Sequence, residues 1–196
     1  MWPWEHLAVG YILFSLLVRV FDWTLDDVSA VALAFGTQFP DLIDKPLAWT
    51  FAVLPSGTSL AHSVFIAVPV SLAVMIVLSR WSRLTVGVGF AVGYLAHPPS
   101  DILYGQLTEG GPLSFDSILW PFVEQSGSVS GGGLFGRVAI YIGEYQEFIA
   151  ISGSTSPQVV GYLVFEAVLL ATAIALWLTD GRPGVELARR AVGRSV

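Results

Sequence analysis

The stretch Leu84–His97, with the sequence LTVGVGFAVGYLAH, decides how this chain folds. It contains no charged residue, and Gly89 and Gly93 stand four positions apart. Small residues at this spacing let helix backbones approach closely in lipid. The stretch therefore predicts an apolar helix that packs against a neighbouring helix inside a membrane-embedded bundle and carries a histidine at its end.

The composition of the whole chain agrees with a membrane protein. The 196 residues are 54% hydrophobic and 12% charged, whereas average globular chains carry about 25% charge. The mean hydropathy is +0.70. So little charge cannot coat a water-exposed surface, which argues strongly against a soluble monomer and against a disordered chain. The net charge of -6, with no basic stripe, argues against nucleic-acid binding, and the absence of cysteine excludes disulfides and thiolate chemistry.

Four further apolar segments complete the predicted bundle. A membrane-spanning helix needs about 20 mostly apolar residues. We expect an all-α, polytopic transmembrane helical bundle with about five main helices, forming a single integral-membrane domain over residues 1–180. Besides 84–97, the predicted segments are Leu7–Trp23, the shorter Val28–Pro40, Leu60–Ser79 and Val159–Leu178.

Between the last two predicted spans the pattern changes. A long irregular loop is expected over residues 105–134, rich in glycine and proline, and a helix over Phe135–Ile149. Residues 181–196 form a polar, arginine-rich tail. If this tail and the Arg80/Arg83 turn both lie inside, as the positive-inside rule requires, the loop and the helix that follows it lie outside.

The three histidines of the chain stand at predicted helix ends together with aspartates. In an up-and-down bundle, the starts of odd helices and the ends of even helices share one side. All of these groups therefore meet at one face, which the orientation argument makes extracytoplasmic. The residues concerned are His6, Asp41, Asp44, His62, His97 and Asp101.

Imidazoles and carboxylates without thiolates suit Zn²⁺, Mn²⁺ or Fe²⁺ in a hydrolytic site. One histidine alone is more often an interfacial or hydrogen-bonded residue than a ligand. Likewise, Pro40–Asp44 by itself is typical of a helix-ending turn with a following cap. The convergence of all three histidines with three aspartates favours a metal site over these alternatives.

An ordered set of short motifs then resembles a known family. The motifs are Trp4-Glu5-His6, Phe39-Pro40-Asp41-Leu42-Ile43-Asp44, Ala61-His62-Ser63, Gly93-Tyr94-Leu95-Ala96-His97 with Asp101, and Leu119-Trp120-Pro121. Together, over about residues 1–122, they resemble the YdjM-like inner-membrane proteins, described as metal-dependent hydrolases. The resemblance implies a distant likeness to zinc phospholipases C and zinc nucleases. It also implies that His62, His97, Asp101 and one aspartate of the Pro-Asp-Leu-Ile-Asp stretch hold one zinc, with His6 and Asp101 contributing to another.

The chain departs from the family pattern at several positions. Gly57 and Thr58 stand where a His-Arg pair is usual, and Lys45 where a histidine often follows the second aspartate. Pro98 and Pro99 are expected to end the helix at His97 and to place Asp101 in a short turn. A one-metal site, a weakened site and a lost activity all remain open.

The predicted function is a membrane-embedded, metal-dependent hydrolase acting on a phosphoester of a lipid or lipid-linked substrate. His6, Asp44, His62, His97 and Asp101 are the expected ligands of a divalent metal, most simply zinc. Asp41 is the expected general base or orienting residue, although Asp41 and Asp44 could exchange roles.

In this prediction membrane lipids are the partners, and the loop of 105–134 shapes the substrate entrance. The rival prediction is a non-catalytic membrane scaffold or small transporter that uses the polar core around Glu166, the one charge inside a predicted span. The sequence leaves the oligomeric state open.

Overall fold

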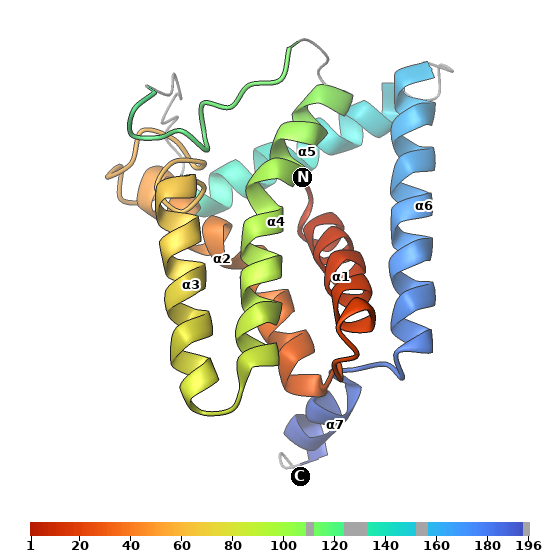
Figure 1. Cartoon of the computed structure of the whole chain (residues 1–196). Coiled ribbons are helices and arrows are strands. Elements are labelled where there is room, and N and C mark those ends of the chain that lie inside the picture. Colours follow the sequence, from red (N-terminus) through yellow and green to blue (C-terminus); the bar gives the residue numbers. More distant parts are fainter. Residues whose placement is uncertain (109–111, 124–132, 152–156, 194–196) are drawn as a thin grey trace.

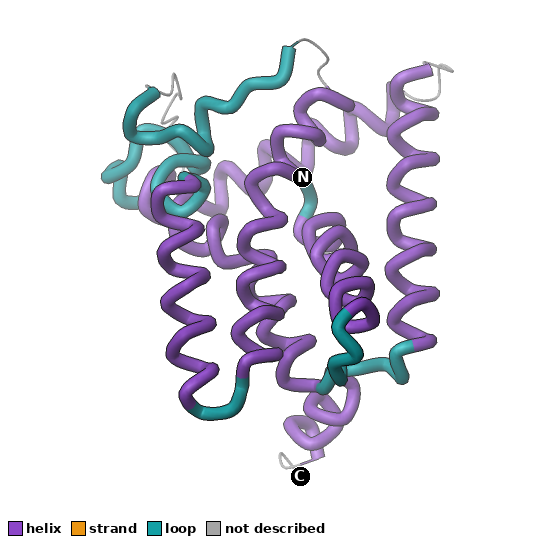
Figure 2. The backbone as a smooth tube through the Cα atoms, in the orientation of Figure 1, coloured by secondary structure: helices purple, strands orange, loops and turns teal. Residues whose placement is uncertain are grey.

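The computed structural model describes residues 1–108, 112–123, 133–151 and 157–193 and is helical throughout its regular parts (Figures 1 and 2). No strand occurs in those ranges. Their seven helices are α1 (Pro3–Val20), α2 (Asp27–Trp49), α3 (Val64–Arg80), α4 (Leu84–Thr108), α5 (Gly133–Ile151), α6 (Pro157–Thr179) and α7 (Val185–Gly193). The all-α prediction is confirmed.

The long helices run up and down, as expected. In Figure 1 the start of α1, the end of α2, the start of α3 and the end of α4 all lie toward the upper end. There α5 crosses the bundle, while α7 and the C-terminus lie at the lower end. The four chain segments that carry the histidines and aspartates therefore share one end of the molecule.

Glycines bring α2 and α4 into close contact. A Cβ atom at Gly93 would overlap the Leu33 carbonyl oxygen, and one at Gly89 would lie 2.7 Å from the Ser29 carbonyl oxygen. On the opposing helix, a Cβ at Gly36 would overlap the carbonyl group of Phe90. The predicted small-residue contact surface is therefore present, and it places the end of α4 directly against α2.

Two predicted helix ends are wrong. The second helix does not stop at Pro40 but continues to Trp49, and α4 passes through Pro98 and Pro99 to Thr108. Proline removes a backbone donor and disfavours helix in the preceding residue. Here the tight packing of α2 on α4 outweighs that local cost. Asp41 and Asp44 are therefore inside α2, and Asp101 lies one helical turn after His97 rather than in a separate turn.

The remaining boundaries differ less. Helix α3 begins at Val64 rather than at Leu60, because the Ser63 side chain caps it by accepting a hydrogen bond from the backbone of Phe65. Helix α5 confirms the helix expected over 135–149, and the arginine-rich tail contains α7. Within the predicted loop, residues 112–123 are irregular, but α4 runs on to Thr108. Residues 109–111 and 124–132 lie outside the described part.

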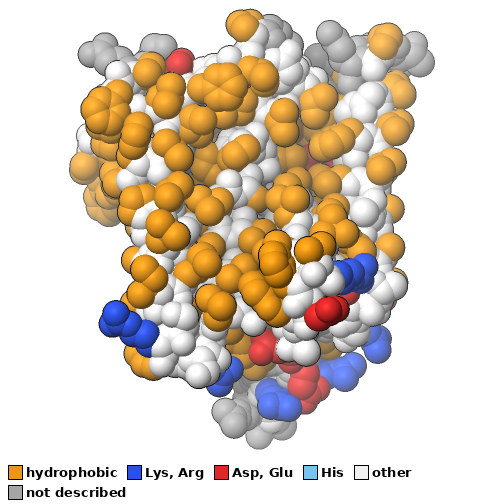
Figure 3. Space-filling model, in the orientation of Figure 1, with side chains coloured by type: hydrophobic (Ala, Val, Ile, Leu, Met, Phe, Trp, Pro, Cys, Tyr) orange, Lys and Arg blue, Asp and Glu red, His pale blue; other side chains and the backbone are white. Residues whose placement is uncertain are grey.

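One helix of the described chain is long and apolar enough to cross a membrane by length and composition. It is the Val159–Thr179 part of α6, with a mean hydropathy of 2.3 and only 11% of its apolar window buried. Helix α3 is apolar but shorter. Figure 3 shows hydrophobic side chains over most of one face of the molecule, with most of the charged ones gathered near the lower end.

Candidate metal centre

His62 is held by a buried carboxylate beneath it. Asp44, on α2, is fully buried and accepts hydrogen bonds from the backbone N–H groups of Ser59, Ala61 and His62 at 2.8, 2.8 and 3.2 Å. The same carboxylate lies 2.8 Å from Nδ1 of His62. This contact assigns the proton to Nδ1 and leaves the Nε2 lone pair of His62 free. Asp44 thus orders the loop before α3 and orients its histidine.

His97 is oriented in the same way by a backbone carbonyl. Its Nδ1 lies 2.6 Å from the carbonyl oxygen of Thr37, across the tight α2–α4 contact. Tyr94, one turn earlier, donates its hydroxyl to the carbonyl oxygen of Ala61 at 2.8 Å and so connects α4 to the His62 loop. With Nδ1 of His97 engaged as a donor, its Nε2 lone pair is also free.

The two free nitrogens meet two carboxylate oxygens. Nε2 of His62 and Nε2 of His97 are 3.2 Å apart. Asp101 Oδ2 lies 3.5 Å from the first and 3.3 Å from the second, and Asp41 Oδ1 lies 3.6 Å from both. Ligands about 2.1 Å from a tetrahedral zinc ion lie roughly 3.4 Å from one another. These five distances therefore have the size of the edges of a zinc coordination tetrahedron.

The donor set can accommodate a cation. Asp41 Oδ1 is buried and has no hydrogen-bond donor, while Oδ2 of the same carboxylate forms an ion pair with Lys45. A buried acceptor left unpaired is costly. When both imidazoles are neutral, their lone pairs and the two carboxylate oxygens also repel one another. A divalent cation bound among them relieves both problems, so the residues present fit a zinc-like ion.

His6 borders this group from the first turn of α1. Its Nε2 lies 3.1 Å from Asp101 Oδ1, and its ring stacks on that of His97 with centroids 3.7 Å apart. Its Nδ1 is buried and has no hydrogen-bond partner. Ligand atoms of His6, Asp41 and His97 lie within 4.8 Å of one another, as do those of His62, His97 and Asp101. Asp101 Oδ2 thus faces His62 and His97, while its Oδ1 faces His6 and also accepts a 2.7 Å hydrogen bond from the N-terminal ammonium group of Met1.

The electrostatics around His62 favour positive charge. Burial lowers the pKa of His62, but the neighbouring carboxylates of Asp101 and Asp44 outweigh it and hold the pKa above its ordinary value. A histidine that is stabilised as a cation lies where negative charge exceeds positive charge. The surroundings of His62 therefore stabilise positive charge.

Five of the six predicted site residues lie together in the structure: His6, Asp41, His62, His97 and Asp101. The sixth, Asp44, lies behind the ring of His62, and both of its oxygens are occupied by donors. The sequence does not predict that the Thr37 carbonyl oxygen orients His97, because a backbone acceptor is present in every residue and so leaves no signal in the residue type.

Two further observations concern the surroundings of the site. Ser63, next to His62, donates its hydroxyl to the Trp120 carbonyl oxygen at 2.6 Å, so the described part of the long loop lies against the histidine loop. Glu166, on α6, accepts a 2.9 Å hydrogen bond from Nε1 of Trp4. Glu166 thus links α6 to the first turn of α1, two residues before His6.

The described residues combine an all-α fold, an uncovered apolar helix and, at one end, a His/Asp cluster that forms a candidate metal centre. A family model described as YdjM inner membrane protein matches residues 1–181. The chain belongs to this family, as its motifs indicated, and is therefore a membrane protein. Comparisons with curated proteins and with solved structures give no match.

Proposed function

We propose that this protein is a multi-pass membrane metallohydrolase that cleaves a phosphoester of a lipid or lipid-linked substrate. One observation carries the proposal: two oriented histidine nitrogens and two carboxylate oxygens converge at distances of 3.2 to 3.6 Å, with one oxygen lacking any donor. Purely structural histidines have no need of such an arrangement.

His62, His97 and Asp101 are the proposed ligands, and His6 extends the set through the second oxygen of Asp101. A zinc ion bound there supplies a Lewis acid and lowers the pKa of a coordinated water toward about 7. Asp44 and the Thr37 carbonyl fix the two ring orientations. Of the two aspartates of α2, Asp41 is the one that faces the ligands, so it has the place of the general base.

The ion pair between Lys45 and Asp41 supports the role of Asp41 as a general base. Its ammonium group engages Oδ2, which holds the carboxylate in one orientation and keeps it ionised. The other oxygen then faces the ligand atoms with no competing donor. A general base must be within hydrogen-bond reach of the proton that it takes. Asp41 Oδ1 lies 3.6 Å from Nε2 of both His62 and His97, so it would stand beside a bound ion as the base or as a fourth ligand.

We further propose that the bundle crosses the membrane several times with the metal centre outside. Six of the nine Lys and Arg residues of the chain stand at the opposite end, in the last turns, connections and short helix of that end. The positive-inside rule assigns that end to the cytoplasm. The six are Arg19, Arg80, Arg83, Arg182, Arg189 and Arg190.

Metal analysis tests the proposal. Detergent-purified protein, loaded with zinc and washed, should retain stoichiometric zinc by elemental mass spectrometry. His62→Ala and His97→Ala should each lose it, while Glu166→Ala, outside the cluster, should retain it. A wild-type protein that binds no zinc, manganese or iron would overturn the proposal in favour of a scaffold or transporter.

A further inference from the structure

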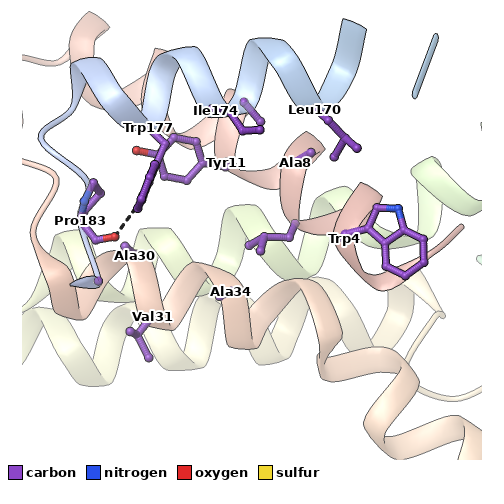
Figure 4. Close-up of a pocket in the computed structure, with 13 residues that line it drawn as sticks. Trp4, Ala8, Tyr11, Ala30, Val31, Ala34, Leu170, Ile174, Trp177 and Pro183 are labelled. Atoms are coloured by element: carbon purple, nitrogen blue, oxygen red, sulfur yellow. Dashed lines mark hydrogen bonds between the residues drawn. The ribbon is translucent and has the colours of Figure 1, made fainter. Parts of the chain in front are cut away.

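A cavity of about 460 Å³ lies between α1, α2 and α6, apart from the metal centre (Figure 4). Small side chains from all three helices create the space, and nearly every residue around it is apolar. The small residues are Ala8 on α1, Ala30 and Ala34 on α2, and Ala173 on α6. Of these, Ala8 and Ala173 are buried.

The rim of this groove is exposed rather than covered. Leu7, Val31 and Ile174 line it and are 39, 50 and 56% exposed. Helix α6, which forms one wall, is the helix long and apolar enough to span a bilayer. The groove is therefore open along the side of a helix that has the length and composition of a membrane span.

Tryptophans define the two ends of the groove. Trp4 donates its indole N–H to Glu166 at 2.9 Å. Trp177 donates its own to the Pro183 carbonyl oxygen at 3.1 Å (Figure 4). Because both polar N–H groups are already paired, the rings offer the groove apolar surface. The Trp4 end belongs to the same helical turn as His6, so it lies on the side of the metal centre.

We propose that this groove binds one acyl chain of a membrane phospholipid, with the headgroup at the Trp4 end. Its lining and its setting favour this occupant. The groove is apolar, opens along an exposed rim, and is walled by the helix that is long and apolar enough to span a bilayer. An unbranched chain is narrow enough to enter between the helices. That the bound lipid is also the substrate rests on the proposed function, whereas binding of the chain does not.

Photolabelling tests the proposal. The protein is placed in phosphatidylcholine nanodiscs that contain a little phosphatidylcholine with a diazirine in its acyl chain, irradiated and digested. Adducts should concentrate on the groove residues of α1, α2 and α6. The substitution Ala34→Trp fills the groove. The groove adducts should then fall about tenfold, because the indole ring displaces several methylene groups of the acyl chain from the groove. The exposed control Val77→Trp on α3 should leave the groove adducts unchanged.

Other outcomes overturn the proposal. Adducts spread evenly over the exposed faces of α3 and α6, or groove adducts unaffected by Ala34→Trp, would show that no chain is held there. Conversion of a dimer to a monomer by Ala34→Trp would assign the groove to a second copy. If Ala34→Trp does not fold, Ala30→Leu fills the same space more mildly. Zinc retention is measured on the same samples. Loss of the groove adducts alone would overturn the groove proposal, and loss of zinc alone would overturn the proposed function.

Discussion

Nε2 of His62 and Nε2 of His97 face each other at 3.2 Å, although the two residues belong to separate segments 35 positions apart. Each ring is oriented by a contact of its Nδ1 atom. Nδ1 of His62 contacts Asp44, and Nδ1 of His97 contacts the carbonyl oxygen of Thr37. Both contacts come from α2. This helix therefore orients the two histidines as well as contributing Asp41.

The first prediction concerns Asp44. Asp44→Asn removes the negative charge that orients His62 while conserving the volume of the side chain. Removing such a supporting partner typically lowers metal affinity about 10- to 100-fold. We expect a loss of this size in zinc affinity, measured by competition with a chelator, and not the complete loss expected of His62→Ala.

Asp116→Asn, in the described part of the long loop, is the matched control and should bind zinc as the wild type does. Complete loss of zinc in Asp44→Asn, with the protein still folded, would show that Asp44 is itself a ligand, as the sequence first indicated.

The second prediction separates the roles of Asp41. Asp41→Asn keeps the shape of the side chain but removes the acceptor of a proton. If Asp41 is a general base, zinc stays bound while zinc-dependent phosphoester hydrolysis falls about 10²- to 10⁴-fold. Zinc content and hydrolysis are measured on the same preparation. Loss of the metal together with the activity would instead make Asp41 the fourth ligand of a closed site.

The sequence predicts which residues approach one another, but not how each one is used. Helix directions alone place His6, His62 and His97 at one end, because an up-and-down bundle leaves no other arrangement. The division of roles between Asp41 and Asp44 requires knowing that Pro40 lies within a helix. Three residues apart on α2, the two carboxylates reach different partners, and a predicted turn carries no such information.

The same limit applies to the end of α4. Pro98 and Pro99 argue locally for a break, and the contacts that overcome this preference come from a helix distant in the sequence. The backbone N–H groups that donate to Asp44 also cannot be predicted from the sequence, because the loop of Ser59–His62 brings them together only in the folded protein. By contrast, Gly89 and Gly93 predict a close helix–helix contact from the sequence alone, because such an approach of two backbones needs small residues.

The third prediction tests that contact. In Gly93→Ala the new methyl group overlaps the Leu33 carbonyl oxygen and lies 2.8 Å from the Thr37 backbone nitrogen, and neither atom can move as a side chain would. Overpacking of this kind costs about 1–3 kcal/mol. We expect a lower thermal unfolding temperature in detergent and weaker zinc binding, since His97 follows one turn later.

Gly105→Ala is the control on the same helix. A methyl group there meets nothing within 4 Å, and replacing a helical glycine adds about 0.5–1 kcal/mol of stability. An equal response of the two variants would show that α2 and α4 are not tightly packed.

The fourth prediction is a pH dependence at the opposite end of the bundle. Asp180 follows α6 and accepts hydrogen bonds from Ser15 and Tyr11 and an ion-paired one from Arg19. Burial raises the pKa of Asp180, but these three donors outweigh it and hold the pKa below its ordinary value of 3.8. The stability that this carboxylate contributes is therefore complete above pH 3.8 and is lost as the pH falls through the lower pKa of the folded state.

Asp180→Asn should lower the unfolding free energy at pH 7 by about 1–3 kcal/mol. The difference between variant and wild type should shrink as the pH falls through the folded-state pKa, followed by thermal unfolding at each pH. Asp22→Asn, at the end of α1, should show neither effect. A difference that stays constant down to the lowest pH at which the protein folds would contradict the assignment to the Asp180 charge.

The last prediction fixes the side on which the metal centre lies. The chain contains no cysteine, so a single introduced cysteine is the only thiol that a maleimide can label. Gln106→Cys is exposed in the last turns of α4, beyond Asp101, and Ser82→Cys is exposed in the turn before α4. Because α4 runs from one to the other, a helix that crosses the membrane must present them on opposite sides.

With a membrane-impermeant maleimide, Gln106→Cys should be labelled in intact spheroplasts and Ser82→Cys only in inverted inner-membrane vesicles. Both should be labelled in detergent, which controls for reactivity. The reverse pattern would place the metal centre in the cytoplasm and contradict the orientation inferred from the arginines. Labelling of both from one side would show that α4 does not cross. Only the expected pattern lets an extracytoplasmic substrate headgroup reach His62 and His97 while its acyl chain stays in the bilayer.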